Sequence, residues 1–294
     1  MKNKICLLVI YNHRYDKNIS VVEQLYCKKF DNIFHIIPFY DGNKDNVIAV
    51  YESSYYFQGY IAQAYQHLKK NGFTHYFIIA DDLILNPIVS QETLFETIGL
   101  NEDEVYFPNF RSLNIPSDWI WKKQALNWKI HQPGVEIQNI LPKAEIVKEI
   151  FLTKGYPLEK IEDGYKTISW KRKLYNKLFG IKREKKYINL DYPLLSGYSD
   201  IIIIPSNLME RFCLYCGAFA ATKLFVENAI PTTLAIIAPK IKFNKDCKLK
   251  YGALWTSEER NSLQKFNYNL NELIKDFPKE KLFLHPIKLS KWKF

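Results

Sequence analysis

The chain has 294 residues, of which 47% are hydrophobic and 24% charged, and it carries a formal net charge of +10. This composition excludes intrinsic disorder, because disordered chains lack the apolar side chains needed for a core. The longest apolar runs are far shorter than the roughly 20 residues that span a bilayer. Lys2 and Lys4 precede a short apolar run without a small-residue cleavage site, so we interpret that run as a buried strand rather than a signal peptide.

The N-terminal third alternates strand and helix patterns. In chain order, we expect a strand over 4–11, a helix over 20–29, a strand over 32–42, a helix over 56–71 and a strand over 74–80. Ser20 is the expected N-cap of the first helix, with Glu23 as its capping-box partner. The alternation predicts a Rossmann-like α/β fold with a mostly parallel central sheet flanked by helices.

The rest of the chain is less regular. We expect a helix over 91–100, a strand over 104–107, one long helix over 207–228 that ends before Pro231, a strand over 233–243 and a helix over 270–275. Residues 111–138 lose periodicity and gather Trp119, Trp121, Trp128, His131 and Pro133. Such a segment is typical either of acceptor recognition or of the packing of a long insertion.

The five cysteines are odd in number and scattered, which is not typical of a secreted disulfide framework. A reducing, cytoplasmic location is therefore expected. Cys213 and Cys216 form a CxxC pair, but no second pair or nearby histidine pair completes a zinc site. We interpret these two residues as thiols packed on a helix.

Residues 166–186 form a basic arm that is rich in lysine and arginine and contains a single glutamate. Its apolar residues recur at near-helical spacing: Trp170, Leu174, Tyr175, Leu178 and Phe179. Such an arm suits the anionic inner face of a plasma membrane or a phosphorylated lipid carrier, and an ordinary solvated helix docked on the core remains the alternative. No nucleic-acid-binding motif accompanies the charge, so we expect no nucleic-acid partner.

Asp81 and Asp82 end the apolar run THYFIIA, at the point where α/β enzymes place their chemistry. Two adjacent buried carboxylates repel each other unless a cation lies between them. Oxygen ligands suit hard divalent cations, which in turn neutralise phosphates. The pair therefore predicts a metal site that serves a nucleotide-linked substrate, and capping of a helix or turn is the structural alternative.

At these residues the chain resembles glycosyltransferases of the GT-A fold, which combine a βαβ nucleotide-binding half with a strand that ends in a DxD-like motif, here Ala80–Leu83. The resemblance implies that Asp81 and Asp82 hold Mn²⁺ or Mg²⁺ on the diphosphate of a nucleotide sugar. It also implies that His285 is a metal ligand, that Lys288 binds the diphosphate and that Asp41 binds the uracil or ribose. One domain is expected over 1–294, with a nucleotide-sugar-binding half over 1–110 and an elaborated acceptor-binding half over 111–294.

Residues after the first strand should lie near the nucleotide, because ligands bind outside the carboxyl ends of parallel strands. We expect Tyr11 to stack on the base, Asn12 to lie beside it and Arg14 to meet a phosphate. An inverting transfer needs a general base, and carboxylates are the usual choice. Glu227, which we place near the end of the long helix, is preferred over Asp200, and the pair at 162–163 is the third candidate.

The sequence thus predicts a glycosyltransferase, of the hexosyltransferase kind, in bacterial surface-polysaccharide synthesis such as capsule or lipopolysaccharide. A UDP-sugar is the favoured donor, and a glycan or lipid-linked molecule is the expected acceptor. The expected location is cytoplasmic, with peripheral attachment to the membrane. A sugar nucleotidyltransferase and a non-catalytic basic protein that binds membrane or glycan are the alternatives; the glycine-rich loop of the former is absent.

Overall fold

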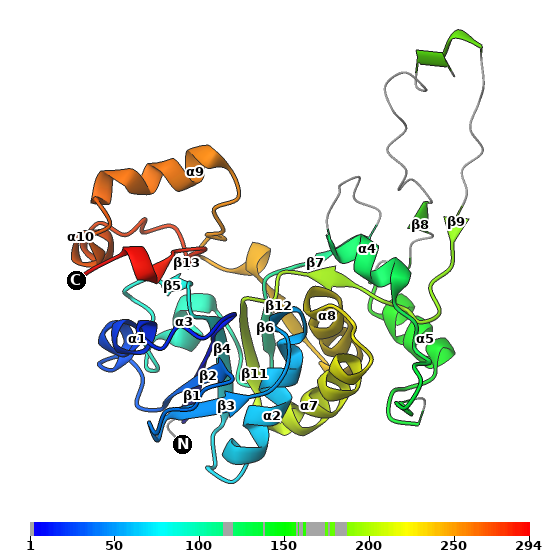
Figure 1. The fold of residues 1–294 in the computed structure, drawn as a ribbon, viewed down its shortest axis with the longest axis horizontal. Coiled ribbons are helices and arrows are strands. Elements are labelled where there is room, and N and C mark those ends of the chain that lie inside the picture. The colour runs from blue at the N-terminus through cyan, green and yellow to red at the C-terminus, as the bar shows by residue number, and fades with distance from the viewer. Residues whose placement is uncertain are drawn as a thin grey trace.

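A seven-stranded sheet with helices on both faces forms the centre of the molecule (Figure 1). The computed structural model describes residues 3–113, 120–137, 139–156, 158, 161–162, 174–175, 177–179 and 187–294. The strand order is β12-β6-β11-β4-β1-β2-β3, and only β11 runs antiparallel to its neighbours among these seven. The predicted α/β class with a mostly parallel sheet is therefore confirmed.

The sheet strands are β1 (Ile5–Ile10), β2 (Ile33–Pro38), β3 (Val47–Val50), β4 (His75–Ala80), β6 (Val105–Phe107), β11 (Ile201–Pro205) and β12 (Ile241–Phe243). Short strands pair outside this sheet: β5 (Ile84–Leu85) with β13 (Phe283–Leu284), β7 (Phe110–Arg111) with β10 (Ser196–Gly197), and β8 (Ile161–Glu162) with β9 (Tyr187–Ile188). The helices are α1 (Asn18–Tyr26), α2 (Gln58–Leu68), α3 (Leu94–Ile98), α4 (Ile120–Asn127), α5 (Ala144–Thr153), α7 (Ser206–Ala221), α8 (Val226–Ile237), α9 (Ser257–Asn261) and α10 (Leu270–Lys275).

Both faces of the sheet are covered, which explains the continuous apolar runs of its inner strands. Along β1, Leu7 and Val9 face a cluster that includes apolar side chains of α1, α3 and α10, whereas Cys6 and Leu8 face a cluster with α2, α7 and α8. The described residues contain no helix that is long and apolar enough to cross a membrane.

The helix expected over 207–228 is in fact two helices, α7 and α8, separated by a turn. Thr222 ends α7, because its hydroxyl donates back to the carbonyls of Ala218 and Phe219, and Lys223 then adopts φ +61°. The strand expected over 233–243 is also wrong. Its first five residues belong to α8, which contains Pro231, and only β12 is extended.

The first helix begins before its predicted cap. Since α1 starts at Asn18, Ser20 lies inside it and its hydroxyl donates to the Lys17 carbonyl. Glu23 accepts from the side chain of Asn46 rather than closing a capping box. The second predicted helix and the strands that became β1, β2, β4 and β6 are confirmed within a few residues.

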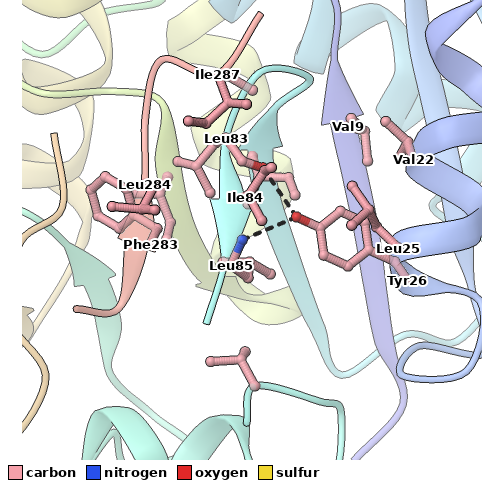
Figure 2. Packing of buried hydrophobic residues seen from close by; sticks show 14 of the residues in the cluster. Val9, Val22, Leu25, Tyr26, Leu83, Ile84, Leu85, Phe283, Leu284 and Ile287 are labelled. Carbon is pink, nitrogen blue, oxygen red and sulfur yellow. Dashed lines mark hydrogen bonds between the residues drawn. The ribbon is translucent and has the colours of Figure 1, made fainter. Parts of the chain in front are cut away.

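The segment that follows the two aspartates is held from both sides (Figure 2). On one side, the backbone of Asp82 accepts from Ile287 N at 2.7 Å, and β5 pairs with β13. On the other side, the Tyr26 hydroxyl donates to the Leu83 carbonyl at 3.0 Å and accepts from Leu85 N at 3.1 Å. The hydroxyl thus takes the place of a neighbouring strand for this short segment.

Candidate active site

The site lies at the carboxyl edge of the parallel strands. There the strand order changes direction, because β1 has β2 and β3 on one side and β4 on the other. Such a switch point is where open α/β sheets bind ligands. Asp81 and Asp82 follow β4 at this point, and Asp81 N donates to the Ile10 carbonyl of β1 at 2.9 Å.

The reversed strand β11 brings Asp200 to the same edge. Because β11 is antiparallel to β4, the residue that precedes it meets the residues that end β4, and Ala80 N donates to the Asp200 carbonyl at 3.0 Å. The first turn of α8 carries Glu227, whereas the sequence predicted that this residue lies near the C-terminal end of one long helix. Asn228 fixes this turn by donating to the Leu195 carbonyl at 3.3 Å.

The C-terminal segment supplies His285. Its Nε2 lies 3.0 Å from Oδ1 of Asp82, while its Nδ1 lies 2.6 Å from the hydroxyl of Tyr198. Oδ1 of Asp82 is buried and has no hydrogen-bond partner apart from this contact with Nε2. The site therefore unites Asp82, His285, Asp200 and Glu227 from four separate segments.

Three acidic groups at the site, Asp81, Asp200 and Glu227, have raised pKa values. Burial, and then the charge of Asp82, raises the pKa of Asp81 to about 7. Burial also raises the pKa of Asp200, although nearby His285 opposes the effect. Burial and the charge of Asp200 raise the pKa of Glu227 well above its usual range, against the opposing charge of Arg111. Asp200 and Glu227 therefore cannot readily ionise together.

His285 responds in the opposite direction. Burial alone would lower its pKa, but the negative charges of Asp200 and Asp82 outweigh burial and raise it. A neutral imidazole that donates through Nδ1 to Tyr198 would leave Nε2 free as a metal ligand, which is the usual way in which an outer partner orients a ligating histidine.

The donor set fits a divalent cation only in part. Among the described residues, no three His, Cys, Asp or Glu side chains are grouped closely enough to hold a metal ion by themselves. Two adjacent ligands of an octahedral ion at about 2.1 Å lie about 3.0 Å apart, as the orphaned Asp82 oxygen and His285 Nε2 do. Asp81 instead accepts a hydrogen bond from the side-chain amide of Asn18 at 3.1 Å, which helps to hold the backbone next to Asp82 in place. Mg²⁺ is commonly held by one or two carboxylates together with substrate phosphates, and this arrangement suits that use.

The residues expected around the nucleotide are distributed differently. Tyr11 is fully buried and its hydroxyl bonds Nδ1 of His35 at 2.9 Å, so the expectation that it stacks on a base is wrong. Asn12 is partly buried after β1. Arg14 is exposed and paired with Asp16 and Asp41, and its hydrogen bonds to Asp41 lower the pKa of that carboxyl. Lys288 is exposed two residues after the Pro286 that follows His285.

Two exposed aromatic residues near Asp41 escaped the sequence reasoning. Phe39 and Tyr51 follow β2 and β3 at the carboxyl edge, with their ring centroids 5.9 Å apart. They are 60% and 67% exposed, and Phe39 adopts φ +54°. A large residue in the left-handed region is strained, and such strain gathers at functional sites. In the sequence, only their positions one residue after an apolar run marked them.

Most of the remaining predicted positions lie away from the edge. Trp128 is buried and donates to the Thr222 carbonyl at 3.0 Å, which favours packing over recognition, while His131 and Pro133 are exposed. Cys213 and Cys216 are packed in α7 as expected. Trp119, the side chains of Trp121 and Glu162, Asp163 and most of the basic arm lie outside the described residues.

Comparison with known proteins finds similarity to solved structures only. No protein-family model matches the chain, and no curated protein matches it. The X-ray structure of the mannosyltransferase Ktr4p from S. cerevisiae in complex with GDP is 12% identical, with a TM-score of 0.36 over 84% of this chain and 70% of that chain. The functional conclusion therefore rests on the geometry of the site.

Proposed function

We propose that the protein is a glycosyltransferase that moves a sugar from a nucleoside-diphosphate sugar to a hydroxyl of an acceptor glycan or lipid-linked glycan. One observation carries the proposal: Asp82 and His285, whose side chains suit a metal ion, share one sheet edge with Asp200 and Glu227, two acids whose pKa values burial raises. The first pair suits a diphosphate and the second suits proton removal, and this transfer needs both.

On the donor side, Asp82 and His285 would hold Mn²⁺ or Mg²⁺. The cation would supply charge neutralisation for the diphosphate that leaves. Asn18 keeps Asp81 in place, and Tyr198 keeps the His285 ring in place. Phe39 and Tyr51 present exposed rings on which a nucleobase can stack, in place of Tyr11, and Asp41 beside them can accept from base or ribose.

On the acceptor side, burial raises the pKa of both Asp200 and Glu227, and the charge of Asp200 raises that of Glu227 further, so ionisation of one disfavours ionisation of the other. The ionised member takes the proton of the acceptor hydroxyl. The acceptor oxygen then forms a bond to the anomeric carbon, the bond from that carbon to the diphosphate breaks, and the nucleoside diphosphate leaves with the electron pair. Arg111 lies close enough to oppose the raised pKa of Glu227.

Of the two acceptors, a lipid-linked glycan is favoured, in keeping with the proposed role in the synthesis of bacterial surface polysaccharide. Four described residues of the basic arm support this proposal: Leu174, Tyr175, Leu178 and Phe179 are each more than half exposed. A surface of this kind, flanked in sequence by cations, suits an anionic lipid interface. Vesicles containing anionic phospholipid should retain the protein, and Leu178→Ser with Phe179→Ser should release it. Equal retention of both proteins would contradict the membrane part of the proposal.

The test of the transferase proposal is nucleotide-dependent stabilisation. UDP, GDP and CMP are added separately, with and without Mn²⁺, and the melting temperature is measured. One nucleotide should raise it, UDP being favoured, and Mn²⁺ should increase the effect. Asp82→Asn should abolish the Mn²⁺-dependent part, whereas Asp103→Asn, before β6 at the opposite edge of the sheet, should not. No response to any nucleotide refutes the proposal, and a stronger response to UTP than to UDP would favour sugar nucleotidyl transfer.

A further inference from the structure

Trp255 is the exposed member of an aromatic group behind the site. Its ring stands edge-on to Tyr198, with centroids 5.9 Å apart, and Tyr198 also contacts Tyr251, Phe283 and His285. Tyr198 and Phe283 are fully buried, whereas Trp255 is 40% exposed. An indole ring therefore reaches the surface directly beside the tyrosine that orients His285.

The backbone that presents Trp255 is held firmly. Leu254 N donates to the His285 carbonyl at 2.7 Å, and the Arg260 guanidinium donates to the carbonyl of Trp255 at 2.9 Å. Thr256 starts α9 with a reciprocal capping box to Glu259. Gly252 lies so close to β13 that a Cβ there would meet the Phe283 carbonyl oxygen at 1.3 Å. These contacts fix the ring before any ligand arrives, which lowers the entropy cost of binding.

The position of Trp255 identifies the part of the substrate that it would meet. The nucleobase region proposed above lies beyond β1, at the ends of β2 and β3, whereas Trp255 contacts residues of the β11 and C-terminal segments. Burial raises the pKa of its neighbour Tyr251, which is also close enough to Asp200 and Glu227 for their charges to raise it further. A molecule that contacts the exposed part of Trp255 therefore lies on the side of the acid pair proposed to remove the acceptor proton.

We propose that Trp255 is the stacking platform for a pyranose ring of the acceptor, and that it positions the acceptor hydroxyl toward Asp200 and Glu227. The C–H bonds of a sugar ring carry partial positive charge and pack against the negative face of an aromatic ring. The inference rests on the proposed transferase function and adds the acceptor subsite to it. Trp255 is a specificity and positioning residue in this proposal, because the proton goes to a carboxylate.

The experiment measures the binding of methyl glycosides by saturation-transfer NMR, in the presence of the diamagnetic ion Mg²⁺ and the nucleotide that stabilises the protein. Methyl glycosides of glucose, galactose, mannose and N-acetylglucosamine serve as probes. Trp255→Leu keeps an apolar side chain but removes the ring, and should weaken the best glycoside at least about tenfold, while Trp255→Phe keeps a ring and should stay within about threefold. Tyr268→Ala is the control, since Tyr268 is 52% exposed and packs on Trp292.

The nucleotide-induced rise in melting temperature should be the same in Trp255→Leu as in the wild type. If no nucleotide stabilises the wild type, the transferase proposal itself fails. If the nucleotide effect is intact but Trp255→Leu binds the glycoside as tightly as the wild type, only the stacking proposal is overturned. It is also overturned if no glycoside of the panel receives saturation from the nucleotide-bound wild type.

Discussion

Tyr26→Phe tests how the segment after Asp81 and Asp82 is held. The substitution keeps the buried ring and removes only the hydroxyl that bonds the Leu83 carbonyl and Leu85 N (Figure 2). Tyr26 is 2% exposed, so water cannot readily replace the hydroxyl. Each buried backbone group left without a partner costs about 1–3 kcal/mol, so the two together should lower the free energy of unfolding by about 2–6 kcal/mol.

The assay is equilibrium denaturation in urea with the wild type and Tyr26→Phe side by side. Tyr192→Phe is the matched control, because Tyr192 is equally buried but its hydroxyl has one backbone partner, the Pro142 carbonyl at 3.0 Å. It should cost about 1 kcal/mol. A loss below about 0.5 kcal/mol for Tyr26→Phe, or a loss no larger than that of the control, would refute the view that this hydroxyl stands in for a strand.

Three further predictions concern buried charge and close packing. Burial lowers the pKa of His35 from 6.5 to about 4, so the unfolded chain takes up a proton that the native protein refuses, and stability should fall by up to about 3 kcal/mol as the pH drops through that window. Urea titrations at several pH values should show this slope flattened in His35→Gln but not in His67→Gln, which is exposed; an unchanged slope would contradict the burial argument. Burial and the charge of Asp200 raise the pKa of Glu227, so the native protein keeps a proton that the unfolded chain loses, and the wild type becomes less stable as the pH rises. The melting temperature of Glu227→Gln relative to that of the wild type should therefore increase between about pH 5 and pH 8, and a constant difference would disprove this. Gly252→Ala should cost about 3 kcal/mol or more, because its Cβ would overlap the Phe283 carbonyl, whereas Gly217→Ala in α7, whose nearest contact would be 3.8 Å away, should be neutral or stabilising; equal stability of the two variants would show that the backbone at Gly252 moves freely.

The sequence predicts the strands of the first half well because both faces of these strands are buried. β1 and β4 are buried at every position, so their apolar runs carry the whole signal. The same signal misleads in α8, where the buried residues Thr233, Leu234 and Ile237 were predicted to form a strand although they pack as a helix. Packing against the rest of the protein makes this segment helical, although the types of its residues favour a strand.

The site was predicted residue by residue but not as an arrangement. Asp82, Asp200 and Glu227 are candidates by residue type and by their place near strand or helix ends, and His285 by the resemblance to GT-A enzymes, yet nothing in the sequence shows that β11 is reversed. Tyr198 contacts both His285 and Trp255. The three residues are far apart in the chain, so the sequence does not reveal these contacts. Tyr11 was misjudged because a strand-end tyrosine can turn inward as easily as outward, and here His35 offers its hydroxyl a buried partner.

The insertion of β11 between β4 and β6 also bears on how the chain could be cut. A strand from the second half of the sequence lies between two strands of the first half, and β12 closes the edge beside β6. A fragment ending near residue 110 would retain β4 and β6 but leave an empty slot between them, with open backbone donors and acceptors on both sides. Two fragments expressed together could therefore recover a site only by threading β11 into that slot, which makes this strand a natural reporter for split-protein complementation.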